Sequence, residues 1–266
     1  MTGTVDALPG AWNFRDITQE TGIRPGRFYR SSELSRLDDA GREALLRLSI
    51  SDVADLRSAR EVERHGAGAV PDGVQVHLLH FHDVTASNDG EAPHESAFRK
   101  MMGEKPDDED IAAAASRFMT EEYTRFPTLP GAQRAIQQVV SLLADGRSLI
   151  AHCFAGKDRT GFTVATVLDA VGVEADAVMA DFLRSNEAVP QLREQILASV
   201  RERIDTAEEV TFVEARLTEA VLGVREEYLV AARRSIADNF GSLRGFLEAS
   251  GVTDDDVARL RAALLG

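Results

Sequence analysis

Residues 148–171 read SLIAHCFAGKDRTGFTVATVLDAV, and this stretch decides the fold. Ser148 to Ala151 is a short apolar run that predicts a buried strand, and Thr160 to Val171 is apolar nearly all round, which predicts a helix buried against the sheet. Between them lies the segment HCFAGKDRTG, His152 to Gly161. A loop that closes onto a helix N-terminus points its backbone N–H groups inward, and the helix dipole adds positive potential there. The sequence therefore predicts an anion site in this loop.

Short strands alternate with helices on the N-terminal side of this stretch. The expected strands are Asn13–Ile17, Arg27–Arg30, Asp52–Leu56 and Val74–Leu79, the last two buried, and the expected helices are Asp38–Leu48, Ser58–His65, Ile111–Phe126 and Ala132–Leu143. From Glu174 to the end the pattern is wholly helical. Alternating strands and helices favour a mostly parallel sheet flanked by helices. We therefore predict a single α/β domain over residues 1–266, with a helical C-terminal elaboration.

The composition is that of a globular protein with an acidic balance. The 266 residues include 30 Lys and Arg against 44 Asp and Glu, so the formal net charge is −14. This charge argues against a non-specific nucleic-acid binder and against a generally basic membrane-binding face. No apolar run reaches the ~18 residues of a membrane span. The first ten residues lack the pattern of a secretion signal, which favours a cytoplasmic protein without membrane insertion.

Cys153 is the single cysteine of the chain, which excludes an intrachain disulfide framework and a multi-cysteine zinc site. The N–H donors of the loop stabilise a thiolate at this position; a free thiol has a pKa of about 8.5, whereas thiols at helix N-termini can reach roughly 3.5–7.5. Arg159 can hold two phosphate oxygens with its planar guanidinium, and Gly156 lets the backbone turn sharply. The thiolate can then attack phosphorus and form a phosphocysteine that water hydrolyses, without a metal or cofactor. The expected phosphate-binding residues are Phe154, Ala155, Gly156, Lys157, Asp158 and Arg159.

The pattern Cys-x5-Arg followed by Thr resembles the signature of cysteine-dependent phosphatases. Thr160 is positioned to donate a hydrogen bond to the departing thiolate, although a plain helix-start threonine would look the same. His152 is expected to brace the loop by hydrogen bonding rather than to act as a base. Two alternatives are a phosphate-binding scaffold that has lost turnover and a rhodanese-like sulfurtransferase. The sulfurtransferase fits less well, since its loop carries an early second cation where Phe154 and Ala155 are apolar here.

Similarity to one family extends beyond this loop. The segments that carry it are Leu8–Asp16 (LPGAWNFRD), Ser31–Arg42 (SSELSRLDDAGR), Asp52–Ser58 (DVADLRS) and Gln191–Arg193 within RSNEAVPQLR. Over nearly its whole length the chain resembles the mycobacterial protein tyrosine phosphatase B family. The resemblance implies a cysteine-phosphatase-like sheet, metal-independent activity on phosphotyrosine, phosphoserine/threonine and phosphoinositides, and a two-helix lid within about residues 192–233. It also implies that export without a signal peptide is an alternative to the cytoplasm.

The leaving group needs a proton, normally from a carboxylic acid. Typical tyrosine phosphatases keep this aspartate in a Trp-Pro-Asp loop, but the only tryptophan here is Trp12 and no such tripeptide follows it. Asp158 lies inside the loop itself, an arrangement that resembles lipid phosphatases of the myotubularin type. Asp83 follows an expected strand upstream of the cysteine. Either aspartate can be the general acid; alternatively, Asp158 only orients Arg159, and Asp83 only caps a turn.

Basic side chains suggest how an anionic substrate is held. Lys157 adds a cation beside the bound phosphate, and lysine followed by aspartate at this point resembles phosphoinositide phosphatases; the alternative is a solvated lysine. Arg57, Arg60 and Arg64 share one face of the expected Ser58 helix, where they form either a basic mouth or a solvated helix face.

An apolar stripe on the C-terminal side has two interpretations. Leu192, Ile196, Val200 and Ile204 recur at helical spacing, which on sequence alone indicates a core face. The family resemblance implies instead an apolar substrate entrance under the lid, formed by Phe98, Phe118, Met119, Leu192, Ile196 and Val200.

Overall fold

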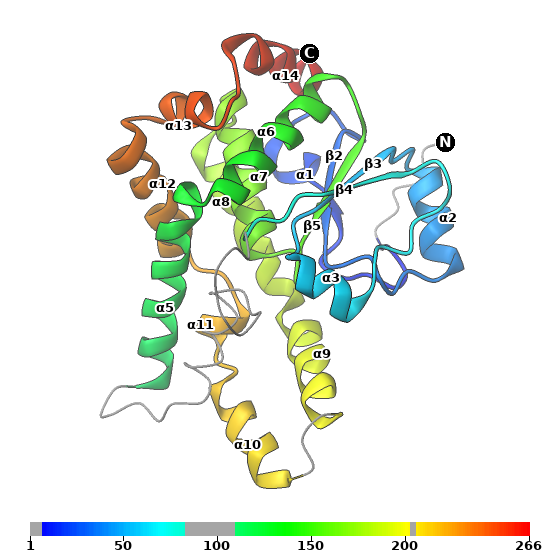
Figure 1. Ribbon diagram of the computed structural model, residues 1–266, viewed down its shortest axis with the longest axis vertical. Helices are drawn as coiled ribbons and strands as arrows, with labels where there is room; N and C mark the ends of the chain where they lie inside the picture. The colour runs from blue at the N-terminus through cyan, green and yellow to red at the C-terminus, as the bar shows by residue number, and fades with distance from the viewer. Residues whose placement is uncertain (1–6, 83–109, 203–205) are drawn as a thin grey trace.

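The computed structural model describes residues 7–82, 110–202 and 206–266, and within them a five-stranded sheet lies at the centre (Figure 1). Its strands are β1 (Arg15–Asp16), β2 (Phe28–Ser31), β3 (Asp52–Asp55), β4 (Gln75–Leu78) and β5 (Leu149–His152). They lie in the order β1-β2-β5-β3-β4, and only the β1–β2 pair is antiparallel. The central strand β5 is buried throughout and ends at His152. The loop expected to bind an anion therefore begins at the carboxyl edge of the sheet, where ligands bind in open α/β folds.

Helices cover both faces of the sheet and form the C-terminal part of the chain. They are α1 (Thr18–Thr21), α2 (Asp39–Arg47), α3 (Ala59–His65), α5 (Ile111–Arg125), α6 (Pro130–Ala144), α7 (Asp158–Val171), α8 (Ala175–Arg184), α9 (Val189–Arg201), α10 (Ala207–Arg216), α11 (Glu219–Leu222), α12 (Glu226–Phe240), α13 (Leu243–Ala249) and α14 (Asp254–Leu265). The expected α/β class, with a mostly parallel sheet and a helical C-terminal part, is confirmed.

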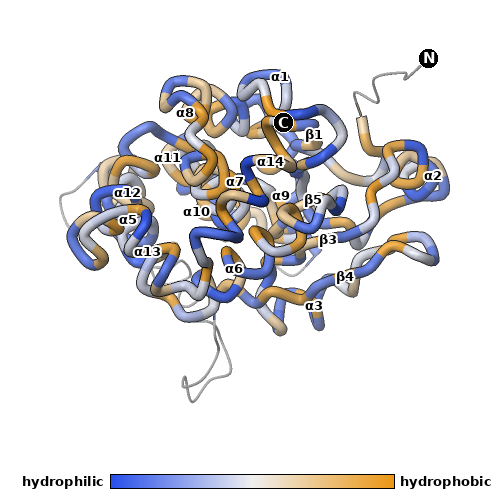
Figure 2. The backbone as a smooth tube through the Cα atoms, turned by 90° about the horizontal axis from the view of Figure 1, so that it is seen from above, coloured by the Kyte–Doolittle hydropathy of each residue, from blue (hydrophilic) through white to orange (hydrophobic). Residues whose placement is uncertain are grey.

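The pleat of β5 divides the core into two parts. Successive strand residues point to opposite faces of a sheet. Leu149 and Ala151 pack into the larger cluster with α6 and α7, whereas Ile150 packs with Leu45 of α2 on the other face. In Figure 2, α7 lies in the middle of the molecule, between the sheet and α12. Its residues Thr160–Leu168 are all buried, as the apolar sequence predicts.

The expectation that Val74–Leu79 is a buried strand is wrong. The observed strand β4 pairs only with β3 at the edge of the sheet, and its residues are exposed or half-buried. Leu78 alone keeps 51% of its surface exposed. An apolar run indicates a strand, but it does not say whether the strand lies at the centre or the edge of a sheet.

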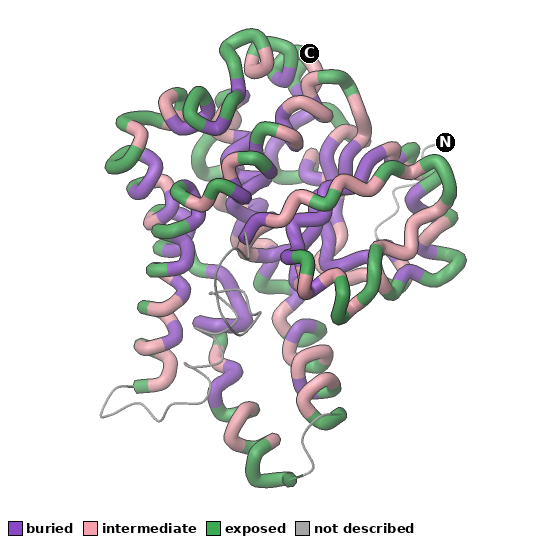
Figure 3. Tube along the Cα trace, in the orientation of Figure 1, coloured by how far each residue is buried: buried purple, intermediate pink, exposed green. Residues whose placement is uncertain are grey.

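Helices α9 and α10 project together from the body of the molecule (Figure 1). Figure 3 shows burial concentrated in the sheet and the helices around it, while α9 and α10 carry many exposed and half-buried residues. At the base of the pair, Leu192 and Leu197 of α9 pack with Ala155 of the loop after β5. The two helices are joined where Arg193 donates to the carbonyl oxygen of Leu217 at 2.6 Å. The pair thus contacts the loop that follows β5.

Candidate active site

The segment from Cys153 to Arg159 (the cysteine loop) connects β5 to α7, which begins at Asp158. Cys153 is only 2% exposed. Gly156 has a φ of +66°, in the left-handed region that favours glycine, and a Cβ there would overlap the carbonyl oxygen of Ser31. The glycine is therefore required both by the turn and by the close approach of β2.

Side chains from distant segments turn the carbonyl groups of residues 154–156 away from the site. The amide of Asn13 donates to two of these carbonyls, at 3.1 and 3.0 Å, and Arg30 donates to one of the same two at 2.8 Å. The third accepts from the backbone N–H of Glu33 at 3.0 Å. The N–H groups of residues 154–159 donate to no acceptor within the described chain. These unused donors form the nest that an anion needs.

A buried ion cluster holds these supporting side chains. Asp181 of α8 accepts from Arg15 at 2.7 Å and from Arg30 at 2.6 Å, and all three side chains are buried. Burial by itself raises the pKa of Asp181, but the two arginines outweigh it and lower the pKa below its ordinary value. Arg15 also donates to Asn13 at 2.7 Å. The cluster therefore ties α8 and the N-terminal segment to the cysteine loop.

Arg159 is fixed by a second carboxylate, Glu61 of α3. The two guanidinium nitrogens and the two carboxylate oxygens pair at 2.6 and 2.7 Å, a bidentate geometry. Burial opposes the charge of Arg159, but Glu61 and Cys153 outweigh it and raise the pKa of the guanidinium. Glu61 is also the third residue of a capping box with Ser58. The sequence analysis did not identify Glu61; the Ser-x-x-Glu pattern at the start of this helix could have drawn attention to it, but that pattern indicates a helix start rather than a site.

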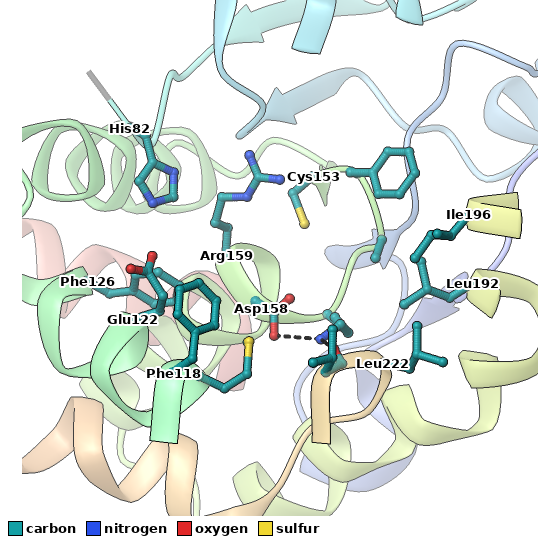
Figure 4. Close-up of a pocket in the computed structure, with 15 residues that line it drawn as sticks. His82, Phe118, Glu122, Phe126, Cys153, Asp158, Arg159, Leu192, Ile196 and Leu222 are labelled. Atoms are coloured by element: carbon teal, nitrogen blue, oxygen red, sulfur yellow. Dashed lines mark hydrogen bonds and ion pairs between the residues drawn. The ribbon is translucent and has the colours of Figure 1, made fainter. Parts of the chain in front are cut away.

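Above the cysteine loop lies a cavity of about 280 Å³ (Figure 4). Of the residues expected from sequence, it is lined by Phe118, Met119, Cys153, Phe154, Ala155, Lys157, Asp158, Arg159, Leu192 and Ile196. Residues that the sequence analysis did not assign to the substrate site also line it: His82, Glu122, Phe126, Val221 and Leu222. The lining is mostly apolar around a few charged groups, as in pockets that bind small organic groups.

Other expected residues lie elsewhere. Asp83 and Phe98 fall outside the described residues. Arg60 is half-buried on α3 and is not among the described residues that line the cavity. Thr160 is fully buried, and its hydroxyl oxygen has no hydrogen-bond partner within the described part of the chain. Its proposed bond to the thiolate stays a prediction.

The expectation that three arginines lie on one exposed helix face is wrong for Arg57. Arg57 is fully buried and pairs with Asp55 at 2.7 Å and Glu33 at 2.9 Å. It belongs to a polar cluster behind the loop, where His152 Nδ1 lies 3.2 Å from the carbonyl oxygen of Cys153. Burial lowers the pKa of His152, which favours the neutral ring. The spacing of the arginines indicated a common helix face, but Arg57 precedes the helix and points into the core.

Lys157 is not a solvated lysine. Its side chain is buried, and its ammonium group donates to the carbonyl oxygens of Val221 at 2.8 Å and Gly223 at 3.1 Å. It also donates to Asp158 Oδ1 at 3.0 Å, and the same oxygen accepts from the hydroxyl of Tyr123 at 3.1 Å. Lys157 therefore joins the cysteine loop to the segment around α11.

Sequence comparisons agree with this geometry. Residues 7–266 match the profile described as the tyrosine phosphatase family, so the chain belongs to this family of enzymes, and the class expected from the sequence is confirmed. It is 56% identical to the triple specificity protein phosphatase PtpB of Mycobacterium tuberculosis, over 98% of this chain and 99% of that protein. It is also 26% identical to a tyrosine-protein phosphatase of Nostoc commune, over 97% of this chain and 81% of that protein. The family membership argues against the sulfurtransferase alternative.

In the part of the chain that the structure describes, no helix is both long enough and apolar enough to cross a bilayer.

Proposed function

We propose that the protein hydrolyses phosphomonoesters through a phosphocysteine on Cys153, without a metal. Its substrates are phosphotyrosine, phosphoserine/threonine and phosphoinositides, in keeping with its likeness to a triple specificity phosphatase. The observation that carries the proposal is the cysteine loop, where the unused N–H donors of residues 154–159 surround Cys153 and a fixed Arg159 in one cavity. A scaffold without turnover is the weaker candidate, because both Cys153 and Arg159 are present.

In the first step, Sγ of Cys153 attacks phosphorus, the Sγ–P bond forms and the ester P–O bond breaks. The N–H groups of the loop and the guanidinium of Arg159 bind the equatorial oxygens, where negative charge is held in the transition state. Because the bidentate pair with Glu61 already fixes the orientation of the Arg159 guanidinium, this side chain needs little reorganisation when the phosphate binds. Thr160 donates to the thiolate when it leaves in the second step.

The departing oxygen takes a proton from a carboxylic acid. We assign this role to Asp158, which lines the cavity beside Arg159 and keeps 23% of its side chain exposed. Asp83 is the alternative and falls outside the described residues. An Asp158→Asn variant is expected to lose activity most strongly on substrates with poor leaving groups. Full activity with an unchanged leaving-group dependence would clear Asp158 of this role.

The apolar walls suit an aromatic phosphoester. Phe118 of α5 faces Leu192 and Ile196 of α9 across the cavity, so a phenyl ring can enter with its phosphate toward the cysteine loop. We propose that α10 and the part of α9 from Leu192 onward form the lid over this entrance, which the resemblance places within about residues 192–233. Lys157 can contact a second phosphate of a phosphoinositide only after it leaves the carbonyl groups of Val221 and Gly223.

The experiment is a p-nitrophenyl phosphate assay with chelator present, run beside a thiosulfate–cyanide assay. We expect phosphate release that EDTA does not reduce and no sulfur transfer. The matched Cys153→Ser variant should be inactive. A panel of phosphopeptides and inositol phospholipids then ranks the substrates; turnover of no phosphoester by the folded protein would favour the scaffold.

A further inference from the structure

Glu122 is a carboxyl group of the cavity that the mechanism above leaves without a role. It lies on α5, is 7% exposed, and lines the same cavity as Cys153, Asp158 and Arg159. Figure 4 shows Glu122 on the α5 side of the cavity, while Cys153 lies on the side of the cysteine loop. A carboxyl group is costly to bury unless it is paired or protonated, so this position calls for an explanation.

The surroundings of Glu122 differ from those of Asp158. Asp158 accepts hydrogen bonds from Tyr123 and Lys157. Glu122 instead has apolar neighbours that line the cavity with it, Phe118, Met119 and Phe126, and its ion-pair partner is Arg125 at 2.7 Å, which is 52% exposed. Burial, opposed by Arg125 and aided by Asp158, raises the pKa of Glu122. Two carboxyl groups in one site with such different surroundings are the arrangement by which enzymes divide acid and base roles.

The position also suits the second half of the reaction. Water must attack phosphorus from the side opposite Sγ, in the space that the leaving group has vacated. Asp158 projects from the loop that carries Cys153, whereas Glu122 projects from α5 on another wall of the cavity. A carboxylate of higher proton affinity is also a stronger base toward water.

We propose that Glu122 is a catalytic base for hydrolysis of the phosphocysteine, which rests on the proposed function. In this step a water oxygen bonds to phosphorus, the P–Sγ bond breaks, and its electron pair restores the thiolate of Cys153. One proton of the water passes to a carboxylate oxygen of Glu122, and inorganic phosphate leaves. The proton then passes to solvent. Asp158 keeps its role in the first step.

Rapid-mixing kinetics with p-nitrophenyl phosphate separate the two steps, because p-nitrophenolate is released in the first. We expect Glu122→Gln to keep a rapid burst of about one p-nitrophenolate per enzyme and then to turn over ~10²-fold more slowly than the wild type. Acid quenching should trap more phosphocysteine in this variant. A burst that slows together with turnover, or kinetics identical to those of the wild type, would overturn the proposal.

Two control variants separate catalysis from structure. Glu121→Gln makes the same change on the neighbouring, exposed residue of α5 and should behave as the wild type. Arg125→Gln removes the ion-pair partner but keeps the carboxyl group. Because Arg125 opposes the rise in the pKa of Glu122, this variant should need a higher pH for fast hydrolysis but should reach it. If Arg125→Gln reproduced the loss at every pH, the role of Glu122 would be structural and the proposal wrong. Failure of the proposed function itself would show differently, as a wild type without any activity that depends on Cys153.

Discussion

Replacing Asp181 with asparagine tests whether the buried ion cluster holds the cysteine loop. The carboxylate of Asp181 is the shared partner of Arg15 and Arg30, and the three side chains are 1%, 6% and 0% exposed. Asparagine has nearly the same shape but no charge, so two guanidinium groups would stay buried with their shared counterion removed. Removing one partner of a buried pair costs about 3–5 kcal/mol of unfolding free energy. We expect Asp181→Asn to lose about that amount, a large part of the stability of a typical domain.

The assay is urea unfolding at pH 7, followed by circular dichroism, with the slope and midpoint fitted together. The matched control is Asp238→Asn on α12, where the pair with Arg234 at 3.6 Å is exposed. That change should cost less than about 0.5 kcal/mol. Because Arg30 and Arg15 also support the cysteine loop, the folded Asp181→Asn protein should show reduced phosphatase activity. Equal effects of the two substitutions on stability would refute the reasoning.

The pH dependence supplies an independent check on the same carboxylate. The pKa of Asp181 is lowered in the folded protein, so its ionised form stabilises the fold. This contribution is complete above the unfolded pKa of about 3.9 and is lost as pH falls through the folded pKa. The stability difference between wild type and Asp181→Asn should therefore stay constant from pH 7 to about 5 and shrink below about pH 4. A difference that grows on acidification would contradict this assignment.

Three further predictions concern the site itself. Glu61→Gln should lower kcat by ~10-fold or more because Arg159 loses its bidentate partner, and steady-state kinetics against the wild type will measure it. Gly156→Ala should abolish activity and lower the melting temperature, since a Cβ would overlap the carbonyl oxygen of Ser31 at a backbone φ of +66°; an active, equally stable variant would contradict this account of the turn. Dialysis against EDTA should leave kcat unchanged, and recovery of lost activity by added divalent cations would contradict metal independence.

Local patterns in the sequence predicted most of the fold. The apolar runs on either side of HCFAGKDRTG correctly predicted β5 and α7. Such a strand and such a buried helix can be predicted because each is indicated by the pattern of residues within its own segment. The same patterns assigned the strand β4 but not its exposure, since its position at the edge depends on which strand pairs with it. The exposure of Arg57 was wrongly predicted for a related reason. Its spacing from Arg60 and Arg64 can be read from the sequence, but its buried pairing with Glu33 and Asp55 cannot.

The groups that hold the site could not be predicted in the same way. Glu61 and Arg159 are 98 residues apart in the sequence, and Arg30 and Asp181 are 151 apart. Only the complete tertiary structure brings such residues together, so a single sequence carries no pattern for the pairs. Asn13 lies in a segment that resembled the family, yet nothing in the segment itself indicated that its amide would hold two carbonyl groups of the loop.

This arrangement explains why the reactive segment can be short. Carbonyl groups that pointed into the anion site beside the N–H groups would repel the anion. In an isolated loop, the N–H groups and the carbonyl groups could both turn toward solvent. Here Asn13 and Arg30 donate hydrogen bonds to the carbonyl groups of the loop, and Glu61 fixes the orientation of the Arg159 guanidinium. Each supporting side chain comes from a different segment of the chain, so the loop itself needs only a cysteine, a glycine and an arginine at fixed spacing. Substitutions of the side chains that support the loop should therefore weaken catalysis and stability together.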